Sequence, residues 1–144
     1  MTGAVLAQTT DANTRTSAFS FPLVGLASTE TIGVNLINMA SNTSNGTAAS
    51  CTGTVAFLNS AGATIGTATP FTLAAGAVST PTLAFSSSGL ASPRGLIRTV
   101  VTTTSTSNVP CALSFTLNTY DTATGVTHVF LIGSGLQSGP SFGR

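Results

Sequence analysis

Few residues in this sequence could do acid–base or metal chemistry. Its 144 residues include one histidine, His128, and three acidic residues, Asp11, Glu30 and Asp121. Asp121 and His128 flank a predicted hairpin turn, which could bring a carboxylate beside an imidazole as in a Ser-His-Asp hydrolase. No amphipathic helix is predicted, so no strand-to-helix turn is expected to present a serine nucleophile. We interpret the pair as polar residues near a loop and predict that the protein is not an enzyme.

The other chemical readings of the acidic residues are equally poor. A glycosidase needs two carboxyl groups on either side of the bond that it cleaves, and Asp11 and Glu30 lie in or near terminal segments. Asp121 with the carbonyl groups of residues 121–125 could form a weak calcium site. An aspartate that bonds its own following backbone is the simpler interpretation. We therefore predict no metal and no cofactor.

The two cysteines, Cys51 and Cys111, each open a predicted strand. Alternate residues of a strand share a face, which places Cys51 with Val55 and Phe57 and Cys111 with apolar residues of its own strand. Both thiols are therefore expected to point into a core. A disulfide between them would suit an oxidising compartment, and the alternative is two buried free thiols.

Charge is almost absent from the chain. Charged residues make up 5% of the sequence and the net charge is +1, whereas an average soluble protein has about 25% charged residues. Four scattered arginines without any lysine cannot neutralise a phosphate backbone, so nucleic acid is not an expected partner. No apolar run approaches the roughly 20 residues of a membrane-spanning helix, and membrane insertion is not expected. Near-neutral surfaces tend to associate, which favours a subunit that packs against copies of itself.

The hydrophobic pattern predicts an all-β protein. Alternating apolar and β-branched residues are interrupted by Gly, Pro, Asn and Ser clusters, and turn signals recur every 8–12 residues. This spacing is typical of an antiparallel β-sandwich, here of about seven to nine strands. The predicted strands cover residues 17–26, 30–39, 51–58, 63–68, 80–85, 96–104, 111–120 and 126–132, with further short strands within 70–78.

The order of four segments resembles a group of secreted bacterial immunoglobulin-like β-sandwich domains of uncharacterised function. The segments are CTGTVAFLNSAGATIG, PFTLAAGAV, GLIRTVVTTT and CALSFTLNTYDTATGVT. The resemblance spans roughly residues 30–132 and implies an immunoglobulin-like fold and a secreted location. It implies no catalytic residue. The sequence departs from classical immunoglobulin domains because it has no tryptophan to pack on a disulfide.

Two segments are predicted to mediate assembly. Residues 1–16 form an N-terminal extension that could add to a neighbour's sheet as a donor strand, followed by a sandwich at 17–132 and a Gly/Ser-rich tail at 133–144. The alternating residues Phe19, Phe21 and Leu23 could fill successive pockets of the neighbour. The last strand is apolar on both faces, which is typical of a strand covered by a partner. Its residues are Val129 and Leu131 on one face, and Phe130 and Ile132 on the other.

These patterns predict a secreted structural subunit that self-assembles into an extracellular filament or surface layer by strand addition. Asn42 and Asn45 are possible glycosylation sites in a surface loop. The alternative is a monomeric cell-surface module that binds carbohydrate or mediates adhesion, with a surface glycan as its partner. The shortage of exposed-type aromatics, with no tryptophan and one tyrosine, makes that alternative the weaker of the two.

Overall fold

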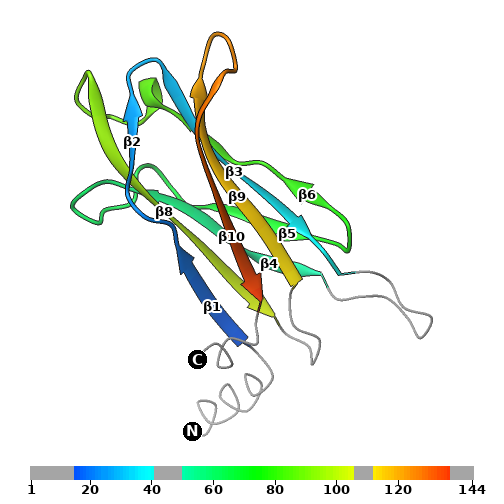
Figure 1. Ribbon diagram of the computed structural model, residues 1–144. Helices are drawn as coiled ribbons and strands as arrows, with labels where there is room; N and C mark the ends of the chain where they lie inside the picture. Colours follow the sequence, from blue (N-terminus) through cyan, green and yellow to red (C-terminus); the bar gives the residue numbers. More distant parts are fainter. Residues whose placement is uncertain (1–14, 41–49, 106–111, 137–144) are drawn as a thin grey trace, which may run out of the picture.

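The computed structural model of the protein describes residues 15–40, 50–105 and 112–136. It contains two antiparallel sheets packed face to face (Figure 1), which confirms the predicted all-β sandwich. The described residues form ten strands, one more than the predicted range. The strands are β1 (Arg15–Ser20), β2 (Val24–Ala27), β3 (Glu30–Asn38), β4 (Cys51–Leu58), β5 (Thr69–Leu73), β6 (Val78–Ser79), β7 (Thr82–Ala84), β8 (Arg94–Ser105), β9 (Ala112–Asp121) and β10 (Thr127–Leu136).

The first sheet has the strand order β1-β8-β4-β5, and β2 also pairs with β8. The second has the order β10-β9-β3-β6, and β7 also pairs with β3. At one edge of each sheet, two short strands pair one after the other with the same long strand. These are β1 and β2 along β8, and β6 and β7 along β3. The chain changes sheet between β5 and β6, where Gly76 has a φ of 78° and allows the tight turn.

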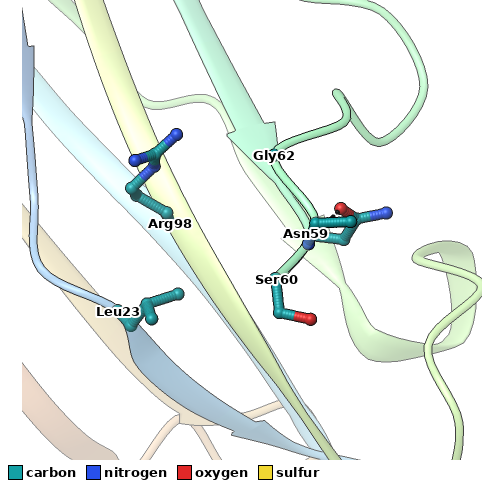
Figure 2. Close-up of a pocket in the computed structure, with 6 residues that line it drawn as sticks. Leu23, Asn59, Ser60, Gly62 and Arg98 are labelled. Carbon is teal, nitrogen blue, oxygen red and sulfur yellow. Dashed lines mark hydrogen bonds between the residues drawn. The ribbon is translucent and has the colours of Figure 1, made fainter.

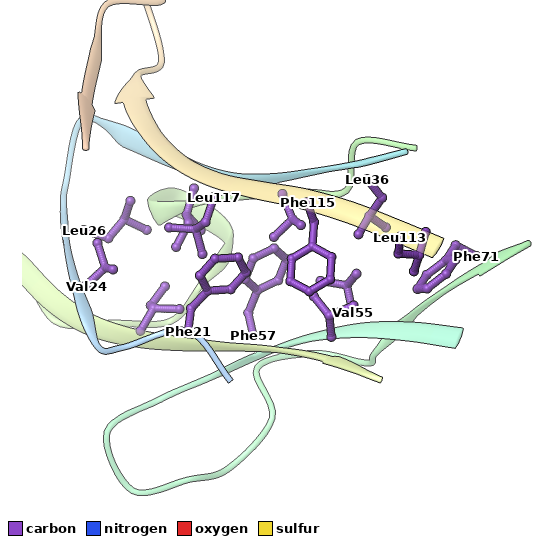
Figure 3. Close-up of a cluster of buried hydrophobic side chains, with 14 of the residues drawn as sticks. Phe21, Val24, Leu26, Leu36, Val55, Phe57, Phe71, Leu113, Phe115 and Leu117 are labelled. Carbon is purple, nitrogen blue, oxygen red and sulfur yellow. The ribbon is translucent and has the colours of Figure 1, made fainter. Parts of the chain in front are cut away.

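Inward-facing residues of both sheets form one core. Buried side chains recur at alternate positions, for example Ile32, Val34 and Leu36 in β3 and Leu113, Phe115 and Leu117 in β9. This is the period of two that a half-buried strand requires. Figure 3 shows Phe21, Phe57 and Phe115 in the middle of this layer, between the two ribbons.

The predicted strand at 17–26 is wrong as a single element. The structure divides it into β1 and β2, separated by residues 21–23. Pro22 has no amide hydrogen for a ladder, and the chain leaves the strand at this point before rejoining the same edge of β8. The predicted strand at 63–68 is also wrong, because only an isolated bridge between Leu58 and Thr64 forms there.

Candidate assembly surface

Strand β1 is the terminal strand of the first sheet. It pairs with β8 from Arg15 opposite Ser105 to Ser20 opposite Val100. No further strand lies beyond it in the described part of the chain. Five of its six residues are exposed and Phe19 is half-buried, so β1 is held mainly by its ladder with β8. Its first two residues, Arg15 and Thr16, lie within the predicted N-terminal extension, whose residues 1–14 are outside the described residues.

An aromatic cluster anchors the inner side of β1. The Phe19 ring lies 5.0 Å from the Phe21 ring and 5.2 Å from the Phe115 ring, measured between centroids. Phe21 is buried and Phe19 packs against the same core. Edge-to-face contacts of this kind add stability beyond the buried area. Phe19 and Phe21, predicted to fill pockets of a neighbour, therefore contact the protein's own core within one chain.

The connection between β1 and β2 lies at residues 21–23. The Phe21 amide donates to the Thr99 carbonyl at 2.9 Å, and the chain then runs through Pro22 to Leu23. Leu23 is 53% exposed and does not share the inward face of Phe19 and Phe21. Since β2 pairs with β8 from Val24 onward, these three residues join two independently paired strands.

Strand β10 is the edge of the second sheet on the side of β1. Its inward residues Val129 and Leu131 pack against the core. Phe130 and Ile132 point outward and are 57% and 74% exposed. The predicted division of these four residues between two faces is confirmed, and the outward pair has no cover within the described residues.

A glycine allows the two sheets to approach at this side. A Cβ atom added to Gly133 in β10 would lie 2.7 Å from the Phe115 ring and 3.0 Å from the Phe19 ring. Real Cβ atoms do not approach so closely, so the β1 aromatic cluster needs glycine at this position. The β1 and β10 edges are thereby brought together on one side of the sandwich.

A shallow hollow of about 260 Å³ lies on the first sheet beside the β1–β2 connection. Figure 2 shows Leu23 and Arg98 on one side and the turn after β4 on the other. Gly62 in that turn has a φ of 87°, and the Asn59 side chain accepts hydrogen bonds from the Ala61 and Ala63 amides. The hollow offers one guanidinium group, polar turn atoms and one apolar side chain, a combination that suits a small polar ligand.

Glu30, Asp121 and His128 lie close together where β3 begins and β9 ends, and Asp11 is outside the described residues. The Glu30 carboxylate accepts a hydrogen bond from the Ala27 amide at 2.8 Å. It also forms a hydrogen bond with Nδ1 of His128, which lies at the register shift between Thr127 and Val129. The predicted partner of His128 was Asp121, and the structure pairs it with Glu30 instead.

Asp121 has the turn-capping role that the sequence predicts. Its carboxylate accepts hydrogen bonds from the amides of Ala123 and Thr124, both at 2.9 Å. The backbone bond from Thr124 is the main cause of a lowered pKa at Asp121, helped by the Thr124 hydroxyl. Across residues 15–40, 50–105 and 112–136, no three His, Cys, Asp or Glu side chains are arranged to hold a metal ion.

Only one cysteine of the predicted disulfide lies within the described residues. Cys51 is 1% exposed at the start of β4, as expected. None of the described cysteines is a free thiol. Cys111 lies outside the described residues, so the pairing itself remains a prediction. The possible glycosylation sites Asn42 and Asn45 also lie outside the described residues.

No protein family, curated protein or solved structure matches this chain. Within the described residues, no helix has the length and apolar character needed to cross a membrane.

Proposed function

We propose that this chain is a secreted structural subunit that assembles with copies of itself by exchanging β1. In the assembly, β1 of one copy would pair with β8 of the next, in the register that Phe19 and Val101 adopt within one chain. The observation that carries the proposal is the attachment of β1: an exposed edge strand held by one ladder and joined to β2 through Pro22. Exchange of an identical element has a low cost because it rebuilds the same contacts.

The sheet edges support exchange in preference to a closed monomer. Natural proteins discourage edge pairing with lysine, proline or inward charges. This chain has no lysine, and β1 carries one charged residue, Arg15, at its first position. Head-to-tail exchange whose rotation does not close into a ring would generate a filament, and filaments side by side would form a surface layer.

A disulfide between Cys51 and Cys111 would fit a subunit exposed outside the cell. The buried side chain of Asn38 in β3 donates to the Leu73 carbonyl of β5 at 2.9 Å. Leu73 is the register partner of Cys51, and Asn38 is the register partner of Leu113. The first residues of β4 and β9 thus belong to the same end of the sandwich, which supports a bridge that joins the two sheets there.

Removal of the donor strand tests the proposal. A chain lacking residues 1–20 should form no filaments at concentrations where the full chain forms polymers seen by negative-stain microscopy. A peptide spanning Arg15–Ser20 should bind the shortened chain and raise its melting temperature, because it supplies the missing partner of β8. A peptide of the same composition in scrambled order is the control. Polymers formed by the shortened chain would contradict the proposal.

The hollow beside Leu23 and Arg98 favours a second candidate function, a monomeric surface module that binds a glycan. Its guanidinium group and turn atoms could bind sugar hydroxyl or carboxylate groups. Its lining residues include no aromatic side chain, whereas stacking on aromatic rings is a usual source of affinity in such sites. We therefore place this function second.

A further inference from the structure

The outer face of the second sheet carries a patch without charge, which we call the outer patch. Its apolar members lie on two sides, with Ile37 and Val78 on β3 and β6, and Phe130 and Ile132 on β10. Short polar side chains of the middle strands lie between them. The outer patch comprises Asn35, Ile37, Val78, Ser114, Thr116, Asn118, Phe130 and Ile132. An outward sheet face of a solitary domain is ordinarily polar and charged.

The surface shape of the outer patch is self-complementary. A hollow of about 260 Å³ is lined by Ile37, Val78 and Thr116, together with neighbouring residues of the same strands. Thr116 lies opposite Ile132 on one side and opposite Asn35 on the other, and its hydroxyl accepts a hydrogen bond from the Asn35 amide at 3.1 Å. Ile132, 74% exposed, therefore lies one strand away from the floor of the hollow. A protruding side chain and a hollow share one face.

The area of the whole outer face of the second sheet is close to the area that a weak, specific interface buries. Four strands spaced about 4.8 Å apart give a width of about 19 Å, and the nine residues of β3 give a length of about 30 Å. Two such faces would together bury roughly 1,100 Å², near the lower limit of about 1,200 Å² for stable interfaces. A charged partner would gain nothing from a patch without charge, whereas a second copy of this chain brings an equally uncharged face.

We propose that the outer patch is the contact with a second copy of the chain, packed face to face about a two-fold axis. The axis runs along the strands between β9 and β3. This rotation reverses the strand order, so β10 of one copy lies over β6 of the other and β9 lies over β3. Ile132 lies in the same cross-strand row as Asn35, so Ile132 of each copy enters the partner's hollow at its Asn35 side, next to Ile37 and Val78. The contact is isologous: every interaction occurs twice.

This contact does not depend on the exchange of β1. The side chains of Phe130 and Ile132 point outward, whereas Phe19 packs against the opposite, inward face of the second sheet. Strand exchange would link subunits end to end. The outer patch would then join two such filaments side by side, and repeated lateral contacts of this kind would form a layer.

Introducing opposite charges at Ile132 and Val78 tests whether these two side chains meet across the interface. Self-association of the full chain is measured by sedimentation velocity over a concentration series, and folding of each variant is checked by circular dichroism. Ile132→Lys and Val78→Glu should each weaken self-association by roughly tenfold or more, since each places an unpaired charge in an apolar contact twice per dimer. The double variant Ile132→Lys, Val78→Glu should recover most of the affinity, because the new charges pair across the two-fold axis.

Val126→Glu is the matched control, because Val126 and Val78 are both 57% exposed and Val126 lies outside the outer patch. It should associate like the unchanged chain. The inference is overturned if the single variants associate normally, if the double variant stays as weak as the single ones, or if Val126→Glu is equally disruptive. Failure of β1 exchange would leave this result unchanged, since none of these side chains contributes to β1 pairing.

Discussion

Glu30 links the two sheets through hydrogen bonds of its side chain. Its carboxylate, 8% exposed, accepts from the Ala27 amide of β2 in the first sheet and pairs with His128 of β10 in the second. Burial raises the pKa of Glu30. The hydrogen bonds from Ala27 and His128, with the positive charges of His128 and Arg94, outweigh burial and hold that pKa below its ordinary value.

This lowered pKa predicts a loss of stability in acid. With a folded pKa below 4.5, the unfolded chain takes up the Glu30 proton first as the pH falls. The stability contributed by Glu30 is therefore complete above pH 4.5 and disappears as the pH drops through its folded pKa. In urea unfolding from neutral pH down to about pH 3, Glu30→Gln should cost about 1–3 kcal/mol at neutral pH and much less in acid. A difference between the two proteins that is constant with pH would contradict this role.

The partner of His128 shows how far sequence can lead at the residue scale. Asp121 is close to His128 along the chain, across a short hairpin, and local spacing made it the expected partner. Glu30 is 98 positions away, and only the β3–β9 register, which sets Glu30 opposite Asp121, brings it near. The capping of the turn by Asp121 depends on neighbouring backbone alone, and this role was predicted correctly.

Local patterns predicted most of the strands. Residues 51–58 form β4 with the predicted bounds, and the predicted hairpin at 111–132 is present as β9 and β10. The predicted start of the Gly/Ser-rich tail at residue 133 is wrong, because β10 continues to Leu136 in its ladder with β9. The break at residues 21–23 was missed because the alternation of Phe19, Phe21 and Leu23 continues through Pro22. The assignment of β5 and β6 to different sheets could not be predicted, because it depends on pairing with strands far away in the sequence.

At the element scale, the proposed bridge would tie β4 to the start of β9. A disulfide that closes a loop of about 60 residues contributes roughly 4 kcal/mol in the chain-entropy model. Reduction should therefore lower the melting temperature by several degrees or more. The Cys51→Ala variant should melt at a similarly low temperature and should not respond to reductant. An unchanged melting curve for the reduced protein would argue against the bridge.

On the scale of the whole molecule, the charged residues within the described part of the chain leave the outer patch neutral. Glu30, Asp121 and His128 interact with one another or with neighbouring backbone at one end of the sandwich. The outer patch has only Ser, Thr, Asn and apolar residues, and β1 carries a single charge, Arg15, at its first position. This distribution favours association, which agrees with the structural role proposed for a chain with 5% charged residues.

The exchange of β1 is tested most directly by a covalent trap between β1 and β8. Ala18 and Thr102 are register partners, and paired strand positions have Cα separations of about 4.5–5.5 Å, within the range of a disulfide. The double variant Ala18→Cys, Thr102→Cys is assembled, oxidised, denatured and separated by non-reducing electrophoresis. Exchange predicts a ladder of covalent multimers that collapses on reduction and is absent from either single variant. A monomer band alone, oxidised within each chain, would contradict the account.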